Sequence, residues 1–121
     1  MRVFPLSFLL LLLPVAAAHA GEADVLRAEA TRNGDGSYRF QVTVSHRDKG
    51  WQHYADKWEI VDATGAVLAT RVLLHPHTEE QPFTRSLSGV QIPAKTGQVT
   101  VRAHDSVHGY GGTTVTVELP R

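Results

Sequence analysis

Alternation of apolar and polar residues is the feature that most constrains the fold of this chain. The clearest case is residues 37–45, where every second side chain is apolar: Tyr38, Phe40, Val42 and Val44. Because successive side chains of a β-strand point to opposite faces, this pattern predicts a strand with one buried face. The preceding Asn33-Gly34-Asp35-Gly36 is typical of a tight turn between two antiparallel strands.

Six further segments are predicted as strands, and turn residues separate them. They are residues 23–32, 57–61, 66–74, 83–88, 98–104 and 113–119. The side chains predicted to point inward are Leu26, Ala28, Ala30, Trp58, Ile60, Leu68, Val72, Leu74, Phe83, Leu87, Val99, Val101, Ala103, Val115, Val117 and Leu119. Seven short strands in about 100 residues predict an all-β fold, an immunoglobulin-like β-sandwich of about seven antiparallel strands. A small β-barrel or jelly roll is the alternative.

The first twenty residues have the pattern of a secretory signal peptide. A basic Met1-Arg2 precedes an almost wholly apolar stretch, and Ala18-His19-Ala20 has the small residues that signal peptidase recognises. The apolar stretch is short for a membrane-spanning helix, which needs about 20 residues. We therefore expect residues 1–20 to be removed after Ala20, leaving residues 21–121 as a single periplasmic or secreted domain. An uncleaved N-terminal anchor is the alternative.

Composition excludes several classes of function. The chain has 121 residues, 12 Lys and Arg, 12 Asp and Glu, and no cysteine. Without cysteine, a disulfide scaffold, a thiolate metal site and a cysteine nucleophile are excluded. The balanced charge gives no reason to expect nucleic acid as a partner, or a membrane surface once the signal is removed.

Histidine is abundant, and its positions are uneven. One of the seven histidines, His19, lies in the predicted signal peptide. The other six are His46, His53, His75, His77, His104 and His108. They lie in or beside the connections that follow the second, fourth and sixth predicted strands, and these connections share one end of an immunoglobulin-like sandwich. All six are therefore predicted to gather at that end.

Clustered imidazoles favour a metal site, because histidine is the commonest protein ligand for Zn and Cu. His75-Pro76-His77 can turn both rings to one side of an extended backbone. His104 and His108 from the neighbouring loop would complete a site for Cu(II) or Zn(II), and these four are the first choices. His46 and His53 are further candidates. His46 also fits a buried histidine with its own hydrogen bond, and His53 also fits packing against its aromatic neighbours.

Other residues are predicted to line the same end, either to orient the metal ligands or to form a ligand pocket. They are Asp105, Glu79, Glu80, Arg85, Trp51, Tyr54 and Tyr110. The carboxylates could complete the ligand set or orient a histidine. Arg85 needs a carboxylate partner if it points inward, and is a solvated charge if it does not. The glycine-rich residues 108–112 are typical of a hairpin connection with close backbone approach, whereas a phosphate cradle is the less favoured interpretation.

The leading hypothesis is a periplasmic protein that binds a divalent transition metal, Cu or Zn, as a carrier, buffer or sensor. Its partners would be the metal ion and another periplasmic protein. An enzyme is not expected, since there is neither a nucleophile-elbow context nor a carboxylate pair with a cleft. The alternative is a non-enzymatic interaction module that uses the same loop end to bind a protein or a glycan.

Three segments carry a resemblance to a known group of proteins. They are residues 50–58 (GWQHYADKW), 75–85 (HPHTEEQPFTR) and 103–112 (AHDSVHGYGG). Together they resemble a family of small secreted bacterial proteins of unknown function, and the resemblance implies no activity. In size, export and histidine content the chain is also similar in outline to periplasmic copper-carrier β-sandwiches of the CopC type. Met1 is the only methionine, so a methionine-rich Cu(I) site is not expected.

Overall fold

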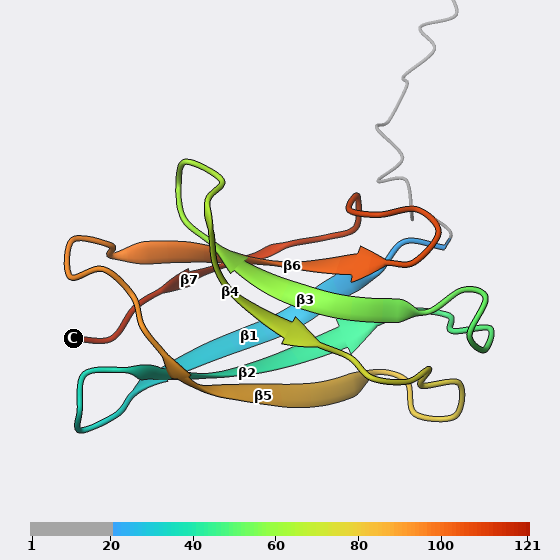
Figure 1. The fold of residues 1–121 in the computed structure, drawn as a ribbon, viewed down its shortest axis with the longest axis horizontal. Coiled ribbons are helices and arrows are strands. Elements are labelled where there is room, and N and C mark those ends of the chain that lie inside the picture. Colours follow the sequence, from blue (N-terminus) through green and yellow to red (C-terminus); the bar gives the residue numbers. More distant parts are fainter. Residues whose placement is uncertain (1–20) are drawn as a thin grey trace, which may run out of the picture.

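The computed structural model describes residues 21–121. The predicted signal peptide lies outside the described residues, so its cleavage after Ala20 stays a prediction. Within residues 21–121, no helix has the length and apolar content that a membrane crossing needs. Figure 1 shows the described part of the chain as two layers of strands.

Both layers are antiparallel sheets. The strands are β1 (Asp24–Arg32), β2 (Tyr38–Ser45), β3 (Ala55–Val61), β4 (Val67–Val72), β5 (Phe83–Val90), β6 (Gln98–Asp105) and β7 (Val115–Glu118). One sheet has the order β1-β2-β5 and the other β4-β3-β6-β7. The predicted seven-stranded β-sandwich is therefore confirmed. In a constant-type immunoglobulin domain the fourth strand lies beside the fifth, whereas β4 here pairs with β3.

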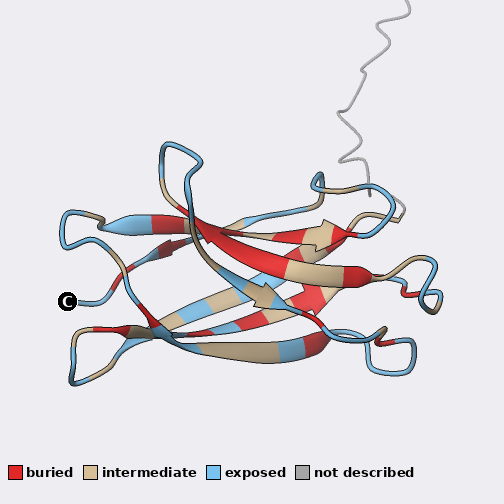
Figure 2. Cartoon of the chain, viewed as in Figure 1, coloured by how far each residue is buried: buried red, intermediate tan, exposed pale blue. Residues whose placement is uncertain are grey.

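The core lies between the two sheets, and the alternation predicts most of it. Phe40, Val42 and Val44 of β2 are fully buried, as are Trp58 and Ile60 of β3. Figure 2 shows buried residues along β3, and in β6 every second residue is buried, from Val99 to Asp105. Each large apolar side chain buried in this way contributes about 1.5–3 kcal/mol of hydrophobic stabilisation.

Three predicted inward side chains are wrong, and each error has a local cause. Leu26 is exposed and Val25 is buried, because a register irregularity between Val25 and Arg27 shifts the alternation of β1. Val72 and Leu74 are also exposed, while Leu73 between them is buried. The chain leaves β4 after Val72, although the backbone N–H of Leu73 still donates a hydrogen bond to the carbonyl oxygen of Asp56 in β3.

The connections that carry the histidines meet at one end of the sandwich, on the right of Figure 1. These are the β2–β3, β4–β5 and β6–β7 connections. The described chain also begins at this end, because β1 runs antiparallel to β2 and Asp24 pairs with Ser45. The last strand, β7, leads to the C-terminus at the opposite end of the sandwich.

Candidate metal centre

Two histidines and one aspartate form a cluster in which a metal ion could be held. His46 follows β2, His53 lies in the loop before β3, and Asp105 is the last residue of β6. Their potential ligand atoms all lie within 4.8 Å of one another. The sandwich thus brings together residues that are far apart in sequence.

The ring of His46 is buried and contacted on both of its nitrogens. Its Nδ1 lies against the carboxylate of Asp48, and its Nε2 lies 2.8 Å from the carbonyl oxygen of Gly21. The same Nε2 contacts Oδ2 of Asp105. Asp48 is itself held in place, since it accepts hydrogen bonds from the backbone N–H of Ala55 (3.0 Å) and of His77 (2.6 Å).

When His46 is neutral, this arrangement leaves the lone pair of its Nε2 atom facing two oxygen atoms. A neutral imidazole has a single N–H, and Asp48 is placed to accept it from Nδ1. The Nε2 atom is then an acceptor directed at Asp105 and at the Gly21 carbonyl. Because three acceptors in contact repel one another, a proton or a metal cation is needed between them. A carboxylate that fixes the far nitrogen is also the usual partner of a metal-bound histidine.

Two more imidazoles face the same oxygens. Nε2 of His53 lies 2.6 Å from Oδ2 of Asp105 and 3.1 Å from the Gly21 carbonyl oxygen. Nδ1 of His108 lies 3.1 Å from that carbonyl oxygen and 3.3 Å from Oδ1 of Asp105. The centre therefore offers nitrogen from three histidines, together with carboxylate and carbonyl oxygen.

The acid–base properties of the cluster agree with this geometry. Burial alone would lower the pKa of His46, but Asp48, the Gly21 carbonyl and Asp105 together raise it above its usual value. Burial alone would raise the pKa of Asp105, but hydrogen bonds from the backbone N–H of His108 and Val107 and from the histidines hold it below its usual value. A charged Asp105 beside a cationic group is thus the favoured state.

The donor set is one that several divalent transition metals use, Fe(II) among them. Imidazole nitrogen with carboxylate oxygen suits Zn(II) and Cu(II), and the chain has no cysteine to supply sulfur. Of the six predicted histidines, the structure brings His46, His53 and His108 together. Asp105, predicted to orient the ligands or line a pocket, contacts the imidazole nitrogens of His46 and His53 directly.

The remaining three histidines lie outside this cluster. His77 is buried and stacked on Phe83, with ring centroids 3.9 Å apart. Neither of its ring nitrogens has a hydrogen-bond partner among the described residues. Burial, together with the charge of Arg85, lowers its pKa. His75 is exposed, and its ring centroid lies 4.6 Å from that of His77.

His104 belongs to a separate polar group on the other side of β6. Successive residues of a strand point to opposite faces, so His104 and Asp105 diverge. Nδ1 of His104 lies 2.5 Å from the carboxylate of Asp56. Its ring packs edge-on against Tyr110, whose hydroxyl donates a hydrogen bond to Glu59.

The other predicted pocket residues lie around the same end without touching the cluster nitrogens. Arg85 is partly exposed and forms an ion pair at 2.9 Å with the exposed Glu80, so the pair lies at the surface. Glu79 is exposed. Trp51 is 67% exposed and packs edge-on against Tyr54.

Two residues that contact His46, Gly21 and Asp48, are not among those predicted from the sequence. Asp48 is predictable from the sequence, because a carboxylate two residues after a histidine can reach the histidine ring in an irregular loop. Gly21 is not predictable from the sequence, since its contribution is a backbone carbonyl that only the tertiary structure brings to the histidines.

The glycine-rich loop makes the close backbone approach that its sequence predicts. A Cβ atom on Gly112 would lie 1.9 Å from the carbonyl oxygen of Ala23, so only glycine fits there. The neighbouring Thr113 exchanges hydrogen bonds with the start of β1, donating to Asp24 at 2.7 Å and accepting from Val25 at 2.8 Å. The loop thus holds the beginning of the domain beside the histidines.

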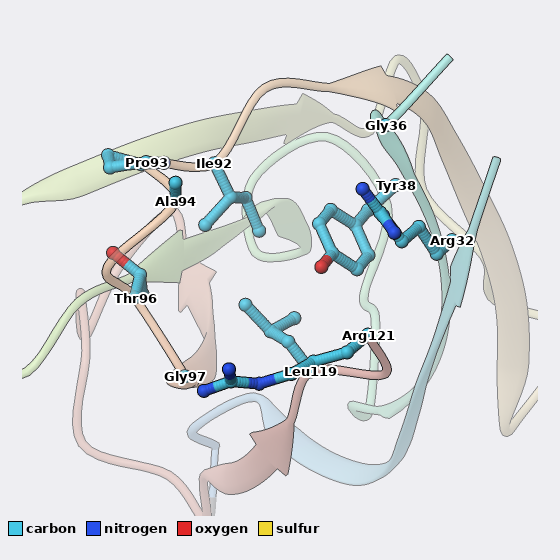
Figure 3. A pocket seen from close by; sticks show the side chains of 10 residues that line it. All are labelled: Arg32, Gly36, Tyr38, Ile92, Pro93, Ala94, Thr96, Gly97, Leu119 and Arg121. Carbon is cyan, nitrogen blue, oxygen red and sulfur yellow. The ribbon is translucent and has the colours of Figure 1, made fainter. Parts of the chain in front are cut away.

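A hollow at the opposite end of the sandwich is unrelated to this centre. Figure 3 shows Tyr38, Ile92 and Leu119 around it, with Arg32 and Arg121 at its sides. None of its lining residues is a histidine or a carboxylate. This hollow therefore lacks the side chains that usually bind a transition metal.

Comparisons with known proteins give one sequence relative and one structural neighbour. No protein-family model matches the chain. It is 40% identical over 97 residues to a protein of Halomicrobium mukohataei named "Putative lipoprotein", a match that covers 80% of this chain and 47% of the relative. The chain thus spans about half the length of that relative.

The structural neighbour is a superoxide reductase (neelaredoxin) from Archaeoglobus fulgidus. The TM-score is 0.54 at 13% sequence identity, and the match covers 89% of this chain and 96% of the neighbour. At this identity the likeness shows the sandwich fold alone. It does not single out the CopC-type carriers to which the sequence is similar in outline. Because the neighbour is an enzyme, the expectation of a non-enzymatic protein gains no support and stays a prediction.

Proposed function

We propose that this chain is an exported metal-binding protein that holds a divalent transition metal, Cu(II) or Zn(II), through His46, His53, His108 and Asp105. Its role would be that of a carrier, buffer or sensor in the periplasm or outside the cell. A reversible site of this kind uses neutral imidazoles, so that acid releases the metal. The ligand set replaces the first choices made from the sequence, since it retains only His108 of those four.

The observation that carries the proposal is that Nε2 of His46 faces oxygen atoms only, so that a cation is required between them. Asp48 takes up Nδ1, and Nε2 is left facing Asp105 and the Gly21 carbonyl. A neutral histidine that gives its one N–H to Asp48 needs a donor or a cation at its second nitrogen. Here it meets acceptors only, and His53 and His108 turn further nitrogens toward the same two groups.

Calorimetric titration of the metal-free chain with Cu(II), Zn(II) and Ni(II) tests the proposal. One equivalent should bind with a dissociation constant far below about 1 mM, which corresponds to about −4 kcal/mol. Absence of binding tighter than that value for all three ions would rule out a metal-binding function.

Two matched substitutions test where the ion binds. His53→Gln removes a nitrogen that faces the cluster, whereas His104→Gln removes one that pairs with Asp56 on the other side of β6. His53→Gln should weaken binding by at least about 10-fold, a loss of about 1.4 kcal/mol. His104→Gln should leave the affinity unchanged. Equal effects of the two substitutions would place the metal elsewhere.

An interaction module at the same end is the second candidate, because Trp51 is 67% exposed beside Tyr54. Exposed aromatic side chains are common anchors of protein and glycan interfaces. In this case Trp51→Ala should abolish capture of the partner and leave the thermal unfolding temperature unchanged. Capture that survives the substitution would count against it.

A further inference from the structure

The first described residue, Gly21, is packed into the histidine cluster. Its carbonyl oxygen lies 2.8 Å from Nε2 of His46 and 3.1 Å from both Nε2 of His53 and Nδ1 of His108. A Cβ atom at this position would lie 2.7 Å from Cε1 of His108, and its φ of 103° is one that glycine adopts readily. The position is therefore reserved for glycine at the centre of the site.

This glycine is also the residue that follows the predicted cleavage point, Ala20. In the uncleaved chain its nitrogen is a peptide amide, whose lone pair is delocalised into the carbonyl and binds metals poorly. Hydrolysis of the Ala20–Gly21 bond by one water molecule leaves a carboxylate on Ala20 and an amine on Gly21. When this α-amino group binds a metal it releases a proton to the solvent, and its localised lone pair then makes it a good metal ligand.

We propose that removal of residues 1–20 turns the α-amino group of Gly21 into a ligand of the metal ion, so that N-terminal processing completes the site. The inference rests on the proposed function, because it requires an ion at the cluster of His46, His53 and Asp105. It adds a regulatory step to that function: the precursor has an incomplete ligand set, and full-affinity loading follows export and cleavage.

The covalent geometry of the backbone makes the amine available. The nitrogen and the carbonyl oxygen of one residue are joined through two carbon atoms, and they lie about 2.7 Å apart when they are on the same side of the Cα–C bond. A cation that contacts the Gly21 oxygen can therefore close a five-membered ring with the Gly21 nitrogen. Because Cu(II) stands highest among divalent ions for nitrogen-rich sites, the completed set favours Cu(II).

The fold keeps this terminus in place after cleavage. Val25 donates its backbone N–H to the carbonyl of Thr113 at 2.8 Å, and Thr113 donates its own to Asp24 at 2.7 Å. Ala23 is buried against Gly112. These contacts lie two to four residues from Gly21, so the amine stays close to the histidines without help from the residues that were removed.

The test compares chains that differ only at the N-terminus. One begins at Gly21, one carries an acetyl group on the Gly21 nitrogen, and one carries two extra alanines before Gly21. Each is titrated with Cu(II), and its metal-free thermal unfolding is measured to show that it is folded. We expect the free amine to bind at least about 10-fold more tightly than both blocked forms, a difference of about 1.4 kcal/mol.

The outcomes separate the two proposals. Equal Cu(II) affinity in all three folded forms would overturn the role of the amine and leave the histidine site intact. Absence of binding in all three would instead overturn the metal-binding function itself.

A spectroscopic readout identifies the ligand atom directly. Chains are produced with ¹⁵N-glycine, and the nitrogen couplings of bound Cu(II) are measured by electron–nuclear double resonance. The form that begins at Gly21 should show a strongly coupled nitrogen that changes with the isotope, and the acetylated form should not. Couplings unaffected by the isotope in the free-amine form would overturn the inference.

Discussion

The carboxylate of Asp48 contacts Nδ1 of His46, and both side chains are fully shielded from solvent. This pairing turns the other ring nitrogen toward Asp105. Asp48 also accepts the backbone N–H of His77 in the β4–β5 connection and of Ala55 at the start of β3. One buried carboxylate therefore ties two loops together and sets the orientation of the histidine that carries the metal proposal.

Asp48→Asn should weaken metal binding without touching a ligand. The amide keeps the shape of the side chain but loses the negative charge, and its NH₂ group cannot accept a hydrogen bond. Loss of a partner that orients a metal-bound histidine typically costs 10- to 100-fold in affinity. A buried N–H left without its acceptor should also reduce the free energy of unfolding by about 1–3 kcal/mol.

The matched control for this substitution is Asp56→Asn. Asp56 also contacts a histidine, His104, but on the far side of β6. We expect the Cu(II) and Zn(II) affinities of Asp56→Asn to equal those of the unmodified chain. If the two variants lose affinity equally in calorimetric titrations, then the His46–Asp48 pair has no special role.

Acid should destabilise the metal-free domain partly through His77. Burial and the charge of Arg85 lower the pKa of this histidine in the folded state, whereas an unfolded histidine titrates near 6.5. As the pH falls below about 6.5, the unfolded chain therefore binds this proton first, and the free energy of unfolding decreases. His46 acts in the opposite direction, because its pKa is raised in the folded state.

The His77→Phe substitution separates the contribution of His77 to this pH dependence from that of His46. The phenyl ring keeps the stacking on Phe83 and removes the titrating group. Urea unfolding in the presence of a chelator, from pH 7.5 down to pH 5, should show a shallower loss of stability in the variant than in the unmodified chain. The slopes should differ by up to about 1.4 kcal/mol per pH unit. Identical slopes would show that His77 does not link folding to protons.

Metal should stabilise the folded domain through mass action. A ligand at about 100 times its dissociation constant raises the free energy of unfolding by about 2.7 kcal/mol when it binds the folded state alone. For a domain of about 100 residues, each kcal/mol corresponds to a shift of about 4–8 °C in the unfolding temperature. Scanning calorimetry should show this increase with Zn(II), and a chelator should reverse it. A chain with His53→Gln should show a smaller increase.

The sequence predicts the sandwich well because its strongest signals are local. The alternation in residues 37–45 and 98–104 places Phe40, Val42, Val99 and Val101 in the core, and all four are buried. It fails at Leu26 and at Val72, where a register irregularity and the end of a strand change which side chain turns inward. Such shifts depend on pairing with another strand, which one segment cannot reveal.

The site is harder to predict than the end of the sandwich that holds it. The order of the strands and loops along the chain is enough to predict that the six histidines lie at one end of the sandwich. It cannot say that His77 stacks on Phe83, or that Asp105 rather than His104 turns toward His46. The direction of a side chain in an irregular loop is decided by contacts from other loops. The contribution of the Gly21 carbonyl has no side-chain signal at all.

Gly112→Ala should damage both the fold and the metal centre. A methyl group at this position would lie 1.9 Å from the backbone carbonyl oxygen of Ala23, so the loop and the start of β1 must separate. Overpacking against rigid backbone typically costs 1–3 kcal/mol or more. Because Gly21 lies two residues before Ala23, the same displacement should move the Gly21 carbonyl away from the histidines and weaken Cu(II) binding.

Gly34→Ala is the matched control, since a Cβ atom on Gly34 meets nothing within 4 Å. It lies in the β1–β2 turn at the opposite end of the sandwich. Urea unfolding should show a loss of at least about 1 kcal/mol for Gly112→Ala, and little change for Gly34→Ala. Cu(II) titration should show weaker binding for the first variant alone. Unchanged stability of Gly112→Ala would mean that the loop and β1 do not approach as closely as the structure shows, and the anchoring of Gly21 beside the histidines would lose its basis.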